Sequence, residues 1–262
     1  FASDPAMADR FEREAQATSR IKSPNVITIH DFGQADDGLL FLVMELLEGQ
    51  SLADRLEKEI SLPWREASRV GSAVARALAA VHEAGVVHRD IKPDNVFLLD
   101  GEGDDRYFVK LLDFGIAKNV ERDGREGDGS DGDRADTSQT KTGQVVGTPY
   151  YMSPEQVTAQ KDPDHTSDLW SVGVLAYEAM VGARPFEGNS FGGIAVAIAS
   201  SPIPVPSRAS PELPQAFDAW FARACSRDRA ARFETAKELG EALRKAVGDP
   251  QALSGSSSGS RS

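Results

Sequence analysis

Cysteine is nearly absent from this chain, which has a single one, Cys225, among 262 residues. An intrachain disulfide is therefore impossible, and a reducing compartment is the expected environment. Cys225 lies in the stretch AWFARACSR, whose apolar spacing is helical. This setting favours an ordinary packed thiol over a catalytic nucleophile or a metal ligand.

Long apolar runs and positive charge are also scarce. The best candidate for a membrane helix, LWSVGVLAYEAMVGA, contains Ser171 and Glu178 and is shorter than the ~18 residues required. The chain has 29 Lys and Arg against 41 Asp and Glu, a formal net charge of −12. This balance argues against nucleic-acid binding and against direct contact with an anionic membrane. Its length and hydrophobic content still suit an enzyme with one domain or two small lobes.

The spacing of apolar residues predicts a helix, then strands, then mainly helices. Residues 7–21 have a helical pattern, and residues 26–33 and 38–46 are typical of two strands joined by a polar turn. Gly49 is the expected break after the second strand. A long helix is expected from Trp64 to Gly85, with Ser61 as its N-cap. The remaining predicted elements are strands at 96–99 and 108–112 and helices at 167–182, 191–200, 212–225 and 235–247.

Two segments have the amino-acid composition of a loosely ordered or flexible chain. Residues 121–136 contain seven acidic residues, three arginines and one apolar residue, Ala135, which predicts a loosely ordered acidic insert. A calcium loop does not fit, because the frame that starts at Asp131 has Ala135 where an oxygen ligand is required. Residues 249–262 end in SGSSSGSRS, the composition of a flexible tail or linker.

Residues 88–95 read HRDIKPDN, between the apolar stretches VV and VFLL. Any one of these residues alone fits a structural interpretation: solvated loop acids for Asp90 and Asp94, and a packed core histidine for His88. Together with DFG at 113–115 and GTPYYMSPE at 147–155, they resemble the eukaryotic-like, Hanks-type serine/threonine protein kinases of bacteria. The order and spacing of the three motifs make the resemblance specific, and it extends over nearly the whole chain.

The resemblance implies an α+β, two-lobed protein kinase fold with ATP between the lobes. Residues 1–46 are expected to form a partial N-lobe. Residues 47–248 are expected to form a mainly helical C-lobe, in which 121–136 is an insert in the activation segment. Residues 249–262 would follow as the tail. The expected partners are Ser/Thr-containing protein substrates, ATP and Mg2+, with a kinase dimer as a candidate state during autophosphorylation.

The same resemblance assigns roles in phosphoryl transfer. Asp90 would orient the attacking hydroxyl, and Lys92 would steady the terminal phosphate. Asn95 and Asp113 would be the magnesium ligands, as suits a cation that prefers hard oxygen donors. Thr148 would contact Asp90 and Lys92 and help to select a hydroxyl acceptor.

Further residues are expected around the nucleotide. Glu14 resembles the helix glutamate that pairs with the phosphate-binding lysine, and Met44 resembles the gatekeeper. Backbone groups of Glu45 and Leu47 would face adenine, and Phe97 would lie beneath it. The structural alternative for Glu14 is an ordinary acidic residue on the surface of a helix. The alternative for the segment that begins at Met44 is a plain strand edge.

Other matches concern support and regulation. The resemblance implies that Glu155 pairs with Arg232, that Asp168 braces the catalytic loop backbone, and that His88 and Phe114 act as packing supports. Thr140 and Thr142 lie where related bacterial kinases carry autophosphorylated threonines, and Arg89 would pair with such a phosphate.

Two parts of the family pattern are missing: a glycine-rich loop and a VAIK-like strand with its lysine. Lys22 is the only lysine before Glu45, but it follows Glu14 and cannot take that role. One interpretation places these parts upstream of Phe1, with this piece alone a poor catalyst. The other is a pseudokinase scaffold or nucleotide-binding regulatory module. Intact metal ligands favour the first. A cytoplasmic location is expected, either alone or as the cytoplasmic part of a membrane-anchored protein.

Overall fold

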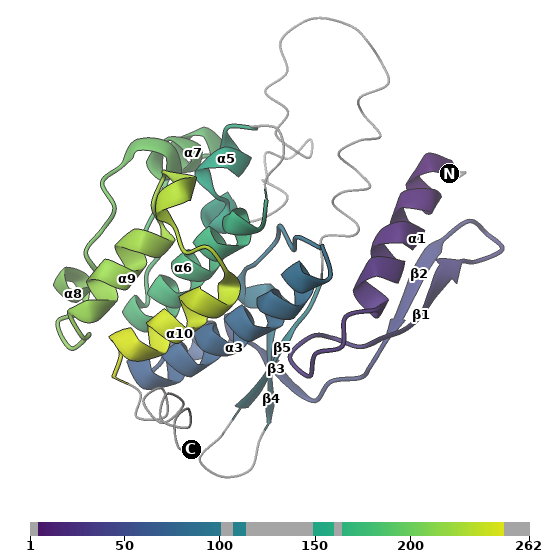
Figure 1. Cartoon of the computed structure of the whole chain (residues 1–262), viewed down its shortest axis with the longest axis horizontal. Helices are drawn as coiled ribbons and strands as arrows, with labels where there is room; N and C mark the ends of the chain where they lie inside the picture. The colour runs from purple at the N-terminus through teal and green to yellow at the C-terminus, as the bar shows by residue number, and fades with distance from the viewer. Residues whose placement is uncertain (1–4, 101–106, 114–148, 160–163, 249–262) are drawn as a thin grey trace, which may run out of the picture.

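The computed structural model describes residues 5–100, 107–113, 149–159 and 164–248 (Figure 1). These residues form two antiparallel sheets and a larger helical body. One sheet contains β1 (Ile29–Gln34) and β2 (Leu40–Met44), and the other has the order β3 (Gly49–Ser51), β4 (Val96–Asp100), β5 (Tyr107–Leu111). The predicted strands are confirmed, with β1 beginning three residues later than expected.

Helix α1 (Pro5–Ser19) lies beside the β1–β2 hairpin (Figure 1). The predicted helix is confirmed, and one of its faces packs inward: Ala15 and Thr18 are buried, and Phe11 packs against the core. The segment after α1 joins this part to β5: the Ile27 N–H donates to the Leu111 carbonyl over 3.0 Å, and the Leu111 N–H donates to the Asn25 carbonyl over 2.8 Å. These bonds attach the smaller sheet to the strand that leads to Asp113.

The β3–β4–β5 sheet has one buried face and one partly open face. Val96, Leu98, Val109 and Leu111 lie on the buried face. Phe97 and Lys110 are direct cross-strand partners and therefore share the other face, where both are only half-buried.

The helical body is built around α6 (His165–Val181), nearly all of whose residues are buried. Helix α3 (Trp64–Glu83) packs between α6 and α10 (Ala236–Ala246). The other helices of the described chain are α2 (Leu52–Glu59), α5 (Pro154–Val157), α7 (Phe191–Ser200), α8 (Pro206–Ala209) and α9 (Ala216–Ala224), with short 3-10 turns η1 (Pro93–Asn95), η2 (Pro149–Tyr151) and η3 (Arg229–Ala231). Cys225 is fully buried, and burial raises the pKa of its thiol, which confirms a packed role.

The predicted N-cap of the long helix is wrong. Pro63, not Ser61, occupies the N-cap of α3, and no side chain caps it. The residues before it are used to reverse the chain after α2: Ile60 has a φ of 65°, and the Leu62 N–H donates to the Ala179 carbonyl of α6 over 2.7 Å. Burial of Leu62 therefore sets where α3 begins.

The sequence interpretation also missed β3 and α2. Helix α2 is short, but a local signal exists: Ser51 and Asp54 form a capping box, in which the Asp54 N–H donates to Ser51 Oγ over 3.0 Å. Gly49 begins β3, and the chain turns there as expected.

Gly49 offers a test of this turn. Its φ is +145°, and an added Cβ would lie 2.1 Å from the Leu98 carbonyl oxygen. Replacing Gly49 by Ala should lower the free energy of unfolding by about 2 kcal/mol or more. Gly192→Ala in α7 is the matched control, since a Cβ there meets no atom within 4 Å. Urea denaturation of both variants measures the difference, and equal stabilities would contradict the turn geometry.

Candidate active site

The HRDIKPDN segment, residues 88–95, begins at His88, directly after the turn that ends α3. Its ring is completely buried, and Nε2 donates to the Leu112 carbonyl over 2.8 Å. Nδ1 accepts the Asp90 N–H over 3.3 Å. Burial lowers the pKa of His88, although Asp168, the Leu112 carbonyl, Asp90 and Asp113 oppose the shift. The ring is thus a neutral support that joins this segment to the chain before Asp113.

Asp168, in the first turn of α6, holds the backbone of the same segment. Its carboxylate accepts the N–H of His88 over 2.9 Å and the N–H of Arg89 over 2.8 Å. His82 of α3 donates through Nε2 to the same carboxylate over 2.8 Å. Arg89 has a φ of 65°, a strained conformation for a side-chain-bearing residue, and these bonds stabilise it. The expected bracing role of Asp168 is present in the geometry.

The loop from residue 90 to residue 95 brings three side chains together: Asp90, Lys92 and Asn95. Asn95 Nδ2 donates to the Asp90 carbonyl over 2.8 Å and to Asp90 Oδ2 over 3.1 Å. Lys92 Nζ lies 3.7 Å from Asp90 Oδ2. Asn95 is buried, whereas Asp90 and Lys92 are partly open to solvent. The acid is therefore held rigidly while its carboxylate remains accessible.

Asp113 follows β5 and is exposed, with a φ of 41°. The Leu112 N–H donates to the Asn95 carbonyl over 2.8 Å, which fixes the chain just before Asp113 beside Asn95. Because the Asn95 amide nitrogen is used by Asp90, its oxygen is the atom that suits a cation. An amide oxygen and a carboxylate are hard donors, so this pair fits Mg2+.

Of the residues expected around the nucleotide, Met44 ends β2 and is 42% exposed. The Glu45 N–H donates to the Thr28 carbonyl over 3.0 Å, and the Leu47 side chain packs against the core. Phe97 lies on the half-open face of its sheet. Glu14 is half-buried on α1.

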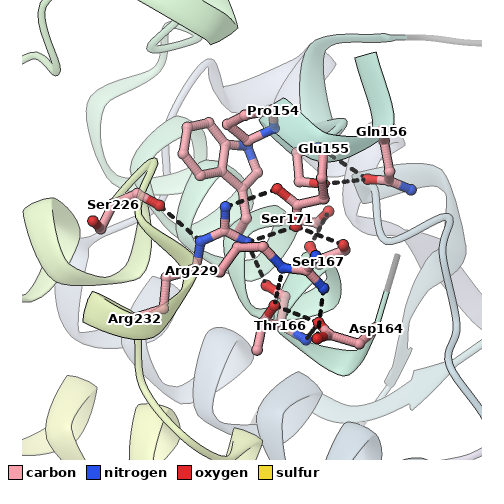
Figure 2. A network of polar contacts seen from close by, with 12 residues as sticks. Pro154, Glu155, Gln156, Asp164, Thr166, Ser167, Ser171, Ser226, Arg229 and Arg232 are labelled. Carbon is pink, nitrogen blue, oxygen red and sulfur yellow. Dashed lines mark hydrogen bonds and ion pairs between the residues drawn. The ribbon is translucent and has the colours of Figure 1, made fainter. Parts of the chain in front are cut away.

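A buried ion pair anchors the segment that follows the 3-10 turn η2. Arg232 Nη1 and Nη2 lie 2.7 and 2.9 Å from the two Glu155 carboxylate oxygens, and both residues are 2% exposed (Figure 2). Ser167 Oγ donates to Glu155 over 2.7 Å, and Arg232 Nη1 also donates to the Thr166 carbonyl over 2.9 Å. The pair thereby joins this segment to the start of α6, as the resemblance implied.

Beside this pair lies a second one that the sequence interpretation missed. Asp164 caps α6 by accepting the Thr166 N–H over 2.9 Å, and its other oxygen pairs with Arg229 (Figure 2). The ion pair and the cap bonds hold the pKa of Asp164 at about 2, although burial opposes ionisation. An Asp directly before a helical pattern was the available signal.

The chain matches the protein kinase domain over residues 2–238. It belongs to the protein kinase domain family. The kinase motifs described above thus lie on the fold that the family uses, and the predicted two-lobed α+β architecture, incomplete in its N-lobe and helical in its C-lobe, is confirmed.

Bacterial serine/threonine protein kinases are among the curated relatives of this kinase domain. The chain is 41% identical over 234 residues to serine/threonine-protein kinase pkn3 of Myxococcus xanthus, a match that covers 88% of this chain and 40% of the relative. It is 34% identical over 250 residues to serine/threonine-protein kinase PknH of Mycobacterium tuberculosis, covering 95% and 37%. The prediction of a Hanks-type bacterial serine/threonine kinase domain is confirmed. The chain spans about two fifths of the length of these relatives.

Solved kinase structures share the fold. The kinase domain of Mycobacterium tuberculosis PknI superposes with a TM-score of 0.68 at 24% identity, covering 94% of this chain and 81% of that one. Rad53 in complex with AMP-PNP gives the same TM-score at 22% identity, covering 88% and 53%.

Several predicted site residues lie outside the described residues: Phe114, Thr140, Thr142 and Thr148. Within the described part, the kinase domain has no helix long and apolar enough to cross a membrane. His82 and Lys110 contact the site but were not predicted, because each depends on a partner far away in the sequence.

The Glu155–Arg232 pair predicts a pH-dependent stability. Its hydrogen bonds hold the Glu155 pKa at about 2, below the ordinary value of 4.5, although burial opposes this shift. A depressed pKa contributes stability that is complete above about pH 4.5 and is lost as the pH falls towards 2. Glu155→Gln should therefore be less stable than wild type at pH 7, and the difference should shrink between pH 4.5 and 2.

Guanidinium denaturation at several pH values measures that difference. Glu57→Gln, on the exposed face of α2, is the matched control and should differ little from wild type throughout. A Glu155→Gln deficit that stayed constant from pH 7 to pH 2 would contradict the ionised pair.

Proposed function

We propose that the protein containing this kinase domain transfers the terminal phosphoryl group of ATP to serine or threonine hydroxyls of protein substrates. The observation that carries the proposal is the assembly of Asp90, Lys92 and Asn95 on a loop whose backbone Asp168 holds. Such a rigid, partly open carboxylate beside a cation suits phosphoryl transfer, which depends mainly on positioning and electrostatic stabilisation.

Asp90 accepts a hydrogen bond from the substrate hydroxyl and aims its oxygen at the phosphorus. The Lys92 ammonium group stabilises negative charge on the transferred group. A lysine two residues after the catalytic carboxylate suits a serine or threonine acceptor. Thr148 completes this role by selecting the hydroxyl, in keeping with its place in the GTPYYMSPE motif.

Asn95 and Asp113 hold Mg2+ through an amide oxygen and a carboxylate. When bound, the cation neutralises phosphate charge. On the other side of the nucleotide, Met44, the Glu45 carbonyl and the Leu47 N–H border adenine, and Phe97 packs beneath its ring. Glu14, on α1, takes the position of the helix glutamate that pairs with a phosphate-binding lysine in the family.

One observation favours a second function, a non-catalytic scaffold or nucleotide-binding regulatory module. These 262 residues contain no glycine-rich loop and no VAIK-like strand with its lysine. The two functions differ in whether phosphate is transferred at all, so one assay separates them.

We further infer that autophosphorylation regulates the kinase. A phosphate on Thr140 or Thr142 pairs with Arg89, whose side chain is exposed next to Asp90. Two copies of the kinase domain come together during this reaction. A cytoplasmic location, alone or as the cytoplasmic part of a membrane-anchored protein, agrees with the use of ATP and with one buried cysteine.

Phosphate transfer to a protein acceptor, with magnesium and labelled ATP, tests the proposal. The full-length protein should label serine or threonine, and Asp90→Asn and Asp113→Asn should each lower kcat by at least about a hundredfold. Asp218→Asn, in α9, is the matched control. No labelling by a folded full-length protein that still binds ATP would favour the scaffold.

Regulation by autophosphorylation has a separate test. Thr140→Ala combined with Thr142→Ala should lower the activity of the full-length kinase about tenfold or more and abolish its increase on preincubation with ATP. Thr158→Ala, in which the lost hydroxyl bonds only the Pro154 carbonyl of its own helix, serves as control. Full activity of the double variant would contradict this mode of regulation.

A further inference from the structure

Lys110 lies at the junction of three parts of the nucleotide site. It is on β5, three residues before Asp113, and it is the direct cross-strand partner of Phe97 on β4. The two side chains share the half-open face of the sheet, whereas their neighbours Val109 and Leu111 point into the core. Lys110 therefore faces the side of the sheet where the nucleotide base is expected.

The Lys110 ammonium group is bound to Glu45. Nζ lies 2.6 Å from Glu45 Oε1, and the two side chains are only 12% and 24% exposed. The Thr28 N–H donates to the same oxygen over 2.7 Å. Burial opposes ionisation of Glu45, but the bonds from Lys110 and Thr28 outweigh it and hold its pKa below the ordinary value. The contact is thus a charged, partly desolvated pair, which is stronger than a surface ion pair.

The pair adds a side-chain link between segments that the backbone already connects in two places: through Thr28, and through β3, whose Ser51 is the cross-strand partner of Phe97. Residue 45 directly follows β2, and its N–H donates to the Thr28 carbonyl. Thr28 follows Ile27, whose N–H bonds the Leu111 carbonyl. A side-chain bond from Lys110 to Glu45 closes this arrangement, because it ties the segment after β2 directly to β5. The bond therefore acts together with the β3–β4 pairing in fixing the backbone of residues 45–47 relative to the Phe97 ring.

We propose that Lys110 is a positioning residue for nucleotide binding: through Glu45 it sets the backbone of residues 45–47 against Phe97 and thereby determines the affinity for the adenine base. This inference rests on the proposed function, since it assumes that ATP binds there. It assigns no chemical step to Lys110, whose ammonium is engaged by the carboxylate. It predicts a change in ATP binding and little change in the phosphoryl-transfer step.

Steady-state kinetics of the full-length kinase, with the ATP concentration varied, tests the positioning role of Lys110. Lys110→Met should raise KM for ATP about tenfold and change kcat less than about twofold, as removal of a positioning charge-assisted bond predicts. Lys110→Arg keeps a cation for the carboxylate and should restore most of the affinity. Lys237→Met, on the exposed face of α10, is the matched lysine control and should resemble wild type.

Glu45→Gln provides the second variant. It keeps an oxygen for the Thr28 N–H but removes the charge that binds Lys110, so it should raise KM for ATP in the same way, even if Lys110→Met fails to fold. Combined with Lys110→Met, it should add little, because both remove one interaction. The ratio of KM for GTP to KM for ATP should fall in both variants, a readout that general destabilisation would not give.

The outcomes separate this inference from the proposed function. An active wild type with unchanged KM for ATP in Lys110→Met and Glu45→Gln would overturn the positioning role alone. The positioning role would also be overturned if Lys110→Met lowered kcat at constant KM for ATP, or if Lys110→Arg did not restore the affinity for ATP. A wild type that neither transfers phosphate nor binds ATP would overturn the proposed function and this inference with it.

Discussion

The Asp168 carboxylate supports the catalytic segment more directly than any other group in the described structure. Two consecutive backbone N–H groups, of His88 and Arg89, donate to it, and His82 donates from α3. Arg89 has a left-handed backbone conformation, which an L residue keeps only when its surroundings enforce it. The position of Asp90 follows, because it comes next in the chain. A buried carboxylate with three donors suits this role, since its charge is stabilised by hydrogen bonds rather than by water.

The start of α6 anchors the other side of the site as well. Glu155 and Arg232 pair against Ser167 and Thr166, one turn from Asp168. Further along α6, Ser171 Oγ donates to the Tyr151 carbonyl over 2.7 Å. Gln156 Nε2 donates to the Arg89 carbonyl over 3.1 Å, a direct link between the two segments. Because α6 is almost wholly buried, both segments take their positions from the most constrained element of the domain.

The β1–β2 hairpin lies outside the helical body. It contacts helix α1, and it is joined to β5 through residues 25–28 and through the Lys110–Glu45 pair. Five of the nine exposed large apolar side chains of the described residues lie there in one eight-residue stretch: Leu39, Phe41, Val43, Met44 and Leu46. An interaction that fixes this part relative to β5 therefore has more influence on its position than it would have in the helical body.

The sequence by itself determined which chemical groups are present and in what order, because the kinase motifs are local: HRDIKPDN supplies acid, cation and amide within eight residues. It also identified the roles of Asp168 and of Glu155 with Arg232, through the resemblance to a family. It placed the N-cap of the long helix two residues too early, because burial of Leu62 against α6 outweighs local capping preference. It also missed α2, a helix of only eight residues, although the Ser51–Asp54 capping box was a local signal for it. Only the tertiary structure decided the pairing of His82 with Asp168, 86 residues apart, and of Lys110 with Glu45, 65 residues apart. Such contacts leave no local pattern in the sequence, since the packing of separate helices and strands brings the partners together.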